Sequence, residues 1–376
     1  MCGLFGMLLN KGYNKNEIFI NKIKHFLNHR GPDGSGCVVW NESSTFVKKI
    51  DKNLNNLDNF KILLWHTRLS ILDLSDNGSQ PMVSEDGRFA LAYNGEIYNF
   101  LEIKQKLIKL NYNFKSESDT EVLIKAWQHW GQNCLKLFNG MFAFSLIDLR
   151  LKKFYLVRDI FGIKPLYWAQ NEKGIFFSSE ISPLLEICND FRKPNLNTIF
   201  QFLKFGHTDR FNATFFSEIN RITPGQLYEF DIDTLEKRRI QKYWTLNVDK
   251  ENLSLNSASA KMKELFLTSV KQHLRSDVPL ALTLSGGIDS SSILSTIIYL
   301  GYKENIELFS YINKTKSQSE EVWIDYLAKH FNLKLNKIFI ESLDFVKAAR
   351  TVVKAQEEPF ATTGIFAQHE VYKKIH

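Results

Sequence analysis

The sequence of 376 residues predicts two architectures in succession: an α+β part, in which helices cover two stacked sheets, and then a parallel α/β part. Two observations lead to this prediction. Residues 140–180 form a run of short apolar segments separated by turns, which is typical of neighbouring strands in a sheet. From residue 278 onward, apolar segments alternate with helical patterns, which is typical of parallel strands joined by helices.

The composition is that of compact globular units. A hydrophobic content of 44% and an aromatic content of 13% suffice for sizeable cores, and the length allows two or three domains. No apolar run approaches the ~20 residues that a membrane helix needs. The segment from Met1 to Leu9 lacks the basic flank of a secretory signal. We therefore expect a cytoplasmic protein that does not act at a membrane.

The net charge of +7 does not predict a nucleic-acid partner. The lysines are scattered along helical segments among Asn and Glu, without a dense basic block or interleaved aromatic residues. We interpret them as a solvated surface. The four cysteines are far apart and lack CxxC spacing, so neither a zinc site nor a disulfide framework is predicted: Cys2, Cys37, Cys134 and Cys188.

Cys2 differs from the other cysteines because it follows the initiator methionine and precedes Gly3. If Met1 is removed, the thiol and a free α-amine lie on the same residue. An α-amine titrates at a pH of ~8, so it can act as the base for its own thiol. A cysteine that simply begins an edge strand would be the simpler interpretation of this residue alone, so the assignment depends on the motifs that follow.

Two motifs follow in the first seventy residues. A helix expected from about Asn14 ends in the turn-rich loop His29-Arg30-Gly31-Pro32-Asp33. Residues 63–71 then alternate like a strand and carry Arg68.

Two further motifs come next. The strand of residues 89–93 breaks into the turn Asn94-Gly95-Glu96, and Ser118 precedes Asp119 as the expected N-cap of a helix. Each motif is weak by itself, but their order and spacing after Cys2 are informative.

With these motifs, residues 2–215 resemble the class II glutamine amidotransferases, which are N-terminal-nucleophile (Ntn) hydrolases, and specifically the glutaminase half of asparagine synthetase. The resemblance implies a four-layer αββα sandwich. It also implies that Cys2 attacks the side-chain amide of glutamine, with its α-amine as general base. The Asn94 side chain and the Gly95 N–H would form the oxyanion hole, in which each donor is typically worth ~3 kcal/mol.

The remaining glutamine-binding residues also come from the resemblance. Arg68 would pair with the α-carboxylate of glutamine, Asp119 would bind its α-ammonium group, and Glu96 would complete the pocket. The alternatives are a surface salt bridge for Arg68 and a helix cap for Asp119. The loop of residues 29–33 is expected to be architectural, and the Arg158-Asp159 pair and the Lys164-Pro165 turn are expected to be structural or interdomain.

Residues 216–253 are predicted to join the two parts. The segments 221–230 and 239–244 are typical of a hairpin, and a polar stretch follows them.

The second part, residues 254–376, opens around the loop Ser285-Gly286-Gly287-Ile288-Asp289-Ser290-Ser291. A short apolar strand precedes this loop and a helix follows it. Two glycines and several hydroxyls let the backbone turn tightly and present N–H groups to an anion at a helix N-terminus. The sequence has neither a Walker motif nor a Gly-x-Gly-x-x-Gly motif.

This loop resembles the pyrophosphate loop of the ATP pyrophosphatases, which have a Rossmann-like fold. The resemblance implies that Leu284 and Tyr311 border the adenine and ribose of ATP, and that Asp289 helps to place Mg²⁺. The acidic turn at 357–360 would lie near the nucleotide or would simply end a helix. The pyrophosphate group would be held by Ser285, Gly286, Gly287 and Ser290.

The synthetase-like part has only three recognisable strands before residue 376, and family members continue into a second glycine-rich acidic loop. We therefore expect a truncated or split synthetase domain. The first hypothesis is a glutamine-hydrolysing asparagine synthetase that uses ATP and aspartate. The second is a glutaminase that acts alone or with a separate synthetase chain, and the third is a nucleotide- or glutamine-binding regulatory module. A carboxylated sugar as acceptor and a homodimer also remain open.

Overall fold

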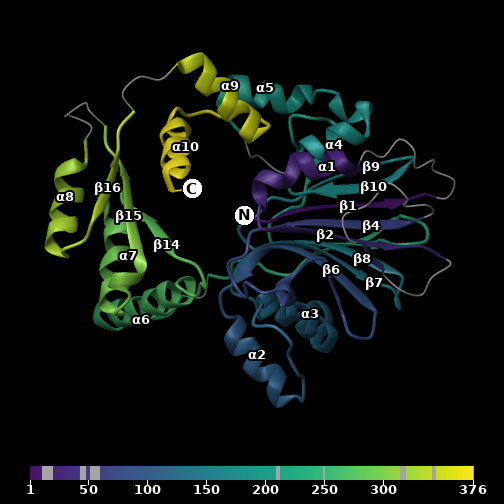
Figure 1. Ribbon diagram of the computed structural model, residues 1–376, viewed down its shortest axis with the longest axis horizontal. Coiled ribbons are helices and arrows are strands. Elements are labelled where there is room, and N and C mark those ends of the chain that lie inside the picture. Colours follow the sequence, from purple (N-terminus) through teal and green to yellow (C-terminus); the bar gives the residue numbers. More distant parts are fainter. Residues whose placement is uncertain are drawn as a thin grey trace. The chain divides into compact units, whose positions relative to one another are not determined.

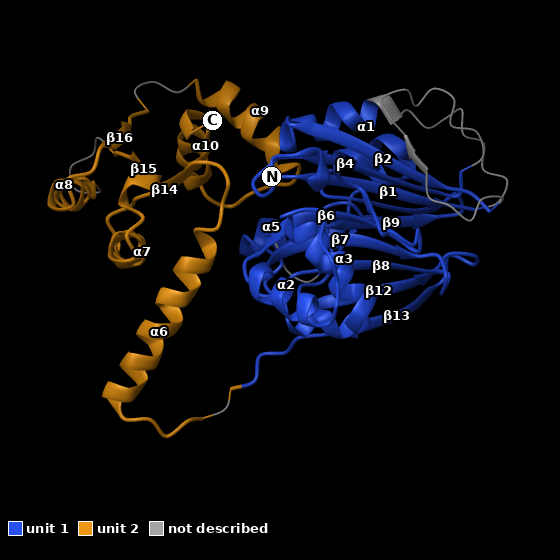
Figure 2. Cartoon of the chain, turned by 60° about the horizontal axis from the view of Figure 1, so that its bottom comes forward, with its two compact units in different colours: residues 1–247 blue, residues 248–376 orange. Residues whose placement is uncertain are grey.

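The computed structural model describes residues 1–10, 20–42, 48–50, 60–208, 212–248, 250–313, 319–340 and 344–375. The chain divides into two compact units, Met1–Asn247 and Val248–His376 (Figure 2). Each unit has its own sheets and its own core.

The first unit is built on two antiparallel sheets (Figure 1). The seven-stranded sheet has the order β11-β9-β10-β1-β4-β2-β3, and the six-stranded sheet has the order β13-β12-β8-β7-β6-β5. The first sheet consists of β1 (Gly3–Leu9), β2 (Gly34–Trp40), β3 (Lys48–Ile50), β4 (Ile62–Arg68), β9 (Tyr167–Asn171), β10 (Gly174–Ser178) and β11 (Asn220–Arg221). The second consists of β5 (Met82–Val83), β6 (Phe89–Ile97), β7 (Gly140–Asp148), β8 (Lys153–Arg158), β12 (Gln226–Asp231) and β13 (Lys237–Lys242).

Helices cover the outer faces of both sheets. One core cluster packs α2 (Phe100–Lys109) and α3 (Asp119–Trp130) on the six-stranded sheet. Another packs α1 (Ile20–Leu27) and α4 (Ser182–Ile187) on the seven-stranded sheet, and α5 (Leu196–Phe205) follows in the chain. A third cluster, which includes Leu4, Leu64, Ala92 and Leu156, fills the space between the sheets. The predicted αββα sandwich is therefore confirmed. The expected start of the first helix at about Asn14 lies outside the described residues.

The hairpin of β12 and β13, which the sequence suggests as a connection between the two parts, belongs to the six-stranded sheet. β12 pairs with β8, and both faces of β12 are covered: Leu227 lies in the core beneath α3, and Phe230 lies in the core between the sheets. The first unit consequently continues to Asn247. A hairpin that joins domains and a hairpin that extends a sheet have the same local pattern, so only the packing distinguishes them.

The second unit contains a three-stranded sheet with the order β14-β15-β16, and both strand pairs are parallel. Its strands are β14 (Leu280–Thr283), β15 (Ile306–Tyr311) and β16 (Leu335–Ile338). Its helices are α6 (Leu255–His273), α7 (Ile288–Tyr299), α8 (Glu321–His330), α9 (Phe345–Gln356) and α10 (Gly364–Ile375). The predicted parallel α/β architecture is confirmed.

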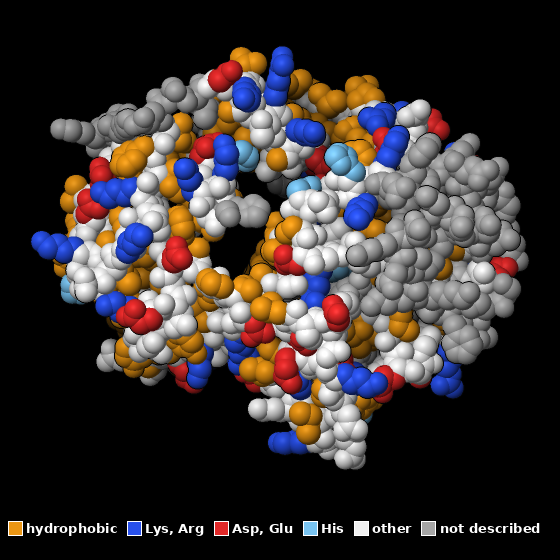
Figure 3. Space-filling view, viewed as in Figure 1, with side chains coloured by type: hydrophobic (Ala, Val, Ile, Leu, Met, Phe, Trp, Pro, Cys, Tyr) orange, Lys and Arg blue, Asp and Glu red, His pale blue; other side chains and the backbone are white. Residues whose placement is uncertain are grey.

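The surface carries mixed charge. On the face shown in Figure 3, Lys and Arg side chains are spread among acidic and apolar side chains. Within the described part of the chain, none of the helices combines the length and the apolar character that a bilayer crossing requires.

Candidate active site

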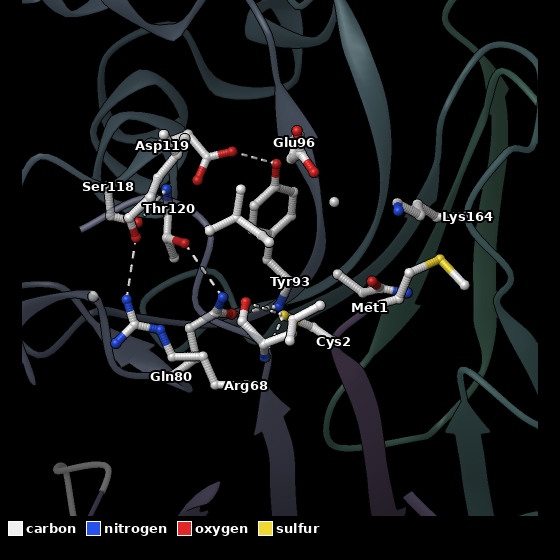
Figure 4. Close-up of a pocket in the computed structure, with 16 residues that line it drawn as sticks. Met1, Cys2, Arg68, Gln80, Tyr93, Glu96, Ser118, Asp119, Thr120 and Lys164 are labelled. Atoms are coloured by element: carbon white, nitrogen blue, oxygen red, sulfur yellow. Dashed lines mark hydrogen bonds between the residues drawn. The ribbon is translucent and has the colours of Figure 1, made fainter. Parts of the chain in front are cut away.

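All six residues that the sequence nominates for glutamine chemistry line a single pocket of about 90 Å³ in the first unit (Figure 4). The strand register brings them together. Gly3 of β1 pairs with Thr67 of β4, so Cys2 lies beside the end of β4 where Arg68 is located. β6 carries three of the residues, and α3 begins with a fourth. The six are Cys2, Arg68, Asn94, Gly95, Glu96 and Asp119.

The Cys2 thiol is held at the end of β4. Its Sγ lies 3.4 Å from the amide nitrogen of Leu69, which donates to it, and 3.6 Å from the carbonyl oxygen of the same residue. Burial raises the pKa of the Cys2 thiol, although the hydrogen bond with the Leu69 backbone opposes this shift. The thiol is therefore protonated at neutral pH, and a base must remove its proton before it can attack.

The loop of residues 29–33 holds the backbone of Cys2. Arg30 Nε donates to the Cys2 carbonyl oxygen at 3.0 Å, and Arg30 Nη1 donates to Glu180 Oε1 at 3.0 Å. His29 Nε2 lies 2.8 Å from the same Glu180 oxygen and is not among the residues that line the pocket. A Cβ atom at Gly31 would lie 2.3 Å from the carbonyl carbon of Thr67, so only glycine fits there. These contacts give the loop an architectural role.

Asn94 presents a buried amide without a partner. The residue is 1% exposed, and neither its Nδ2 nor its Oδ1 makes a hydrogen bond to any described residue. Buried polar groups are nearly always hydrogen-bonded, and leaving one unsatisfied costs about 1–3 kcal/mol. An amide held in this state in the same pocket as a thiol is suited to bind a substrate oxygen. Its neighbour Gly95 packs so closely on β7 that a Cβ atom would lie 2.4 Å from the Met141 carbonyl oxygen.

Asp119 is a buried carboxylate at the first position of α3, and Ser118 caps that helix as predicted, because its side chain accepts from the Thr120 N–H. Asp119 Oδ2 accepts from the Tyr93 hydroxyl at 2.7 Å and from the Ile97 N–H at 2.9 Å, and both donors belong to β6. Burial raises the pKa of Asp119 to about 6, and these two hydrogen bonds oppose the shift. Asp119 is therefore an anion at neutral pH, in a pocket that would favour a cationic ligand group.

The pKa of Asp119 predicts a pH dependence for glutamine binding. Above pH 6 the carboxylate is ionised and would attract the α-ammonium group of glutamine, and below pH 6 it is protonated and this attraction would be lost. We expect the KM for glutamine to rise about tenfold between pH 7 and pH 5, as one ionised group is lost. Initial rates of glutamate formation at several pH values measure this. The Asp119→Asn variant should have a high KM at every pH with little slope, whereas a flat KM in the unmodified protein would contradict the assignment.

The Arg68 guanidinium is oriented by backbone carbonyls of the loop that follows β4. Nη1 donates to Ser75 O at 2.8 Å, and Nη2 donates to Leu72 O at 3.2 Å and to the carbonyl oxygen of Asp73. A Cβ atom at Gly78 would lie 2.1 Å from Nη2, so the guanidinium packs directly on that glycine. No salt bridge joins Arg68 to a carboxylate within the described ranges, which does not favour the surface salt-bridge alternative.

Sequence reasoning missed several residues of the pocket. Gln80 Oε1 accepts from the Tyr93 N–H at 2.8 Å, and Gln80 Nε2 lies 3.3 Å from Thr120 Oγ1, so Gln80 links β6 to α3. Tyr93 looked like an ordinary strand residue and Lys164 like a turn residue, although both line the pocket (Figure 4). The turn Ser79-Gln80-Pro81 is the one local feature that could have indicated Gln80.

In the second unit, the predicted ATP-binding residues gather at the carboxyl edge of the parallel sheet. The loop follows β14, and Tyr311 ends β15. Gly286 has a φ of 78°, which favours glycine, and Gly287 begins α7 without a side-chain cap. The hydroxyls of Ser285 and Ser290 lie 3.1 Å apart. The first turn of α7 thus presents uncapped N–H groups, which fits a phosphate.

Two of the residues assigned to ATP are placed differently from the rest of the loop. The Leu284 side chain is 2% exposed and packs in the core of the second unit, so only its backbone faces the edge of the sheet. Asp289 lies in the first turn of α7, and the described residues contain no group of three or more His, Cys, Asp or Glu side chains arranged to hold a metal. Most ligands of a Mg²⁺ ion at this place would therefore have to come from ATP and water.

The acidic turn at 357–360 ends a helix. Glu357 is the C-cap of α9 with a φ of 59°, and Glu358 is 8% exposed.

Comparison with known proteins identifies the family. The glutamine amidotransferase domain model matches residues 1–244, and the asparagine synthase model matches residues 261–376. The chain belongs to the asparagine synthetase family. It is an enzyme of the asparagine-synthetase-like glutamine amidotransferase type, in which a synthetase domain follows the amidotransferase domain.

Three relatives show the range of this family. The chain is 30% identical to the "Putative asparagine synthetase (glutamine-hydrolyzing) 2" of Methanocaldococcus jannaschii over 99% of its own length and 71% of the relative. It is 27% identical to asparagine synthetase 3 of Bacillus subtilis, over 96% of its own length and 57% of the relative. It is 28% identical to the amidase chry2 of Gibberella zeae, over 80% of its own length and 43% of the relative. The chain thus spans about half to three quarters of the length of these relatives.

Proposed function

We propose that this chain hydrolyses glutamine at Cys2 and uses the ammonia, with ATP, to convert aspartate into asparagine. The products are asparagine, glutamate, AMP and pyrophosphate. The observation that carries the proposal is the amide of Asn94, which has no partner in the described part of the chain and lies in the same pocket as the Cys2 thiol. A buried amide that is not already hydrogen-bonded can donate to an oxygen on which negative charge develops during the reaction, and so stabilise the transition state.

In the proposed first half-reaction, Met1 has been removed and the α-amine of Cys2 takes the proton of the thiol. The thiolate attacks the side-chain carbonyl carbon of glutamine, and the oxygen of the tetrahedral intermediate accepts hydrogen bonds from Asn94 Nδ2 and the Gly95 N–H. The carbon–nitrogen bond then breaks, the amine returns its proton to the leaving group, and ammonia departs. Water hydrolyses the thioester, which releases glutamate and regenerates the thiol.

The proposed binding of glutamine follows from the charges of the pocket. The α-ammonium group would pair with Asp119, and the α-carboxylate would bind the guanidinium of Arg68, which the carbonyls of residues 72–75 already orient. Glu96 would complete the pocket. A guanidinium whose position is already held loses less conformational freedom when it binds the carboxylate.

In the proposed second half-reaction, the aspartate side-chain carboxylate attacks the α-phosphate of ATP and forms an acyl-adenylate with release of pyrophosphate. Ammonia then displaces AMP. The loop backbone with Ser285 and Ser290 would hold the pyrophosphate group, and Mg²⁺ bound with ATP near Asp289 would offset the phosphate charge.

Product analysis tests the proposal. The purified protein is incubated with glutamine, aspartate, ATP and Mg²⁺, and glutamate, asparagine, AMP and pyrophosphate are quantified. We expect asparagine and AMP in equal amounts, with at least as much glutamate, and an intact mass lower by one methionine residue. Glutamate without AMP would assign the chain as a glutaminase only, and AMP formed only with a carboxylated sugar would replace aspartate as acceptor. Retention of Met1 or absence of glutamate would refute hydrolysis at Cys2.

A further inference from the structure

Lys164 lies in the glutamine pocket, although none of the steps above uses it. Its side chain is among those that line the pocket with Cys2 and Glu96, and the residue is only 5% exposed (Figure 4). Lysine is rarely buried to this extent unless it is paired. No salt bridge joins its ammonium group to a carboxylate in the described part of the chain. Burial lowers the pKa of the Lys164 ammonium group, and the charges of Glu96 and Cys2 oppose that shift. A buried lysine of this kind calls for a reason other than stability.

The turn that carries Lys164 is fixed by hydrogen bonds to both the N–H and the carbonyl group of this residue. The buried carboxylate of Asp159 accepts from the Lys164 N–H at 3.0 Å, and the Arg158 guanidinium donates to the Lys164 carbonyl oxygen at 2.8 Å. The same two side chains bind further backbone groups around the turn, at Phe142, Phe161, Gly162, Ile163 and Ile222. The lysine is therefore presented to the pocket by a rigid turn, which suits a functional residue better than a solvated one.

The pocket has an electrostatic conflict that a cation would relieve. Asp119 on α3 is the anion proposed to receive the ammonium group of glutamine, and Glu96 on β6 adds a second carboxylate. Both line the pocket together with Cys2. Negative charge near Cys2 disfavours its thiolate, and negative charge near the chain terminus favours the protonated amine, which cannot act as a base. The same anions that bind the substrate would thus suppress the nucleophile.

Positive charge from two sides opposes this effect. The terminal amine in this structure belongs to Met1, and burial is the largest cause that lowers its pKa. The charges of Arg30, in the loop before β2, and of Lys164 lower this pKa further. Burial raises the pKa of the Cys2 thiol and the charge of Asp119 adds to this shift, whereas the charge of Lys164 lowers it. The charge of Lys164 thus acts both on the Cys2 thiol and on the amine at the chain terminus.

We propose that Lys164 is a positioning residue of the glutaminase reaction whose ammonium group offsets the charges of Glu96 and Asp119 at the nucleophile. It keeps the amine unprotonated and the thiolate accessible while the two carboxylates bind glutamine. The assignment rests on the proposed function of Cys2, and it explains why the turn of residues 158–164 is so strongly held.

Alkylation of Cys2 by iodoacetamide across about pH 6 to 10 tests the proposal without requiring turnover. The other three cysteines are buried, and the Cys2→Ala variant measures any background labelling. In Lys164→Met, we expect the pH of half-maximal alkylation rate to rise by about 0.5–1 unit, since a nearby positive charge is lost. Lys164→Arg, which keeps the charge, should retain the midpoint of the unmodified protein.

A double variant separates charge compensation from a structural role. In Lys164→Met/Glu96→Gln, the midpoint should return toward that of the unmodified protein, because there is less negative charge to offset. Thermal unfolding identifies variants that do not fold, and Lys164→Gln then serves as the neutral substitute. An unchanged midpoint in a folded neutral variant, or no return in the double variant, overturns the proposal. A Lys164-dependent midpoint in a protein that forms no glutamate would support the charge compensation at Cys2 and refute glutamine hydrolysis.

Discussion

Replacing Cys2 with alanine is expected to abolish glutamine hydrolysis. The thiol is the only nucleophile proposed for the reaction, and no other cysteine lines the pocket. Loss of the nucleophile in comparable hydrolases lowers the rate by about 10⁴-fold or more. Glutamate release from glutamine measures the effect directly.

Two controls make the result specific. Cys188→Ala removes a buried thiol that lies outside the pocket, and it should hydrolyse glutamine normally. Cys2→Ala should still form asparagine when ammonium salts replace glutamine, because the synthetase half does not need the thiol. Hydrolysis at the unmodified rate in Cys2→Ala would remove the basis of the proposed function.

Replacing Asn94 with alanine should separate catalysis from stability. We expect the rate constant for hydrolysis to fall by about 10² to 10³, which is the effect of losing one oxyanion-hole donor. The KM for glutamine should change little, since the amide is proposed to act on the charge that develops in the transition state. Steady-state kinetics at saturating glutamine measure both quantities.

The stability of Asn94→Ala provides an independent test. The Asn94 amide is buried and makes no hydrogen bond to described residues, so its removal deletes an unsatisfied polar group. The free energy of unfolding should therefore fall by less than about 1 kcal/mol. A matched comparison is Gln80→Ala, which deletes an amide that links β6 to α3 and should destabilise the protein more. A large loss of stability in Asn94→Ala would assign the residue a structural role instead.

Much of the candidate site could be predicted from the sequence because its residues belong to short local motifs that resemble those of a known family. Gly95 has to be glycine where β6 and β7 approach closely, and Ser118 and Asp119 open a helix with an ordinary N-cap. These features depend on the backbone conformation of a few consecutive residues. The strands and helices of both units follow from the same kind of local pattern.

Other features could not be predicted because they depend on which strands become neighbours. The Tyr93 hydroxyl donates a hydrogen bond to Asp119, which lies 26 residues away in the sequence. Arg30 donates to the Cys2 carbonyl oxygen, 28 residues away. Lys164 lines the pocket from a turn whose backbone is held by Arg158 and Asp159. Likewise, β12 belongs to a sheet because apolar side chains on both of its faces pack into core clusters formed by other elements.

The sequence by itself determined the two architectures and the order of the motifs, since apolar periodicity and turn chemistry act over a few residues, and the resemblance of those motifs to a known family indicated six residues of the candidate site. Only the tertiary structure decided that the Asn94 amide has no partner among the described residues, that Asp119 is buried enough to titrate near pH 6 and that Lys164 lines the same pocket as Cys2. Burial and electrostatic interactions depend on atoms brought together from distant parts of the chain, so they cannot be derived from the spacing of residues along the sequence.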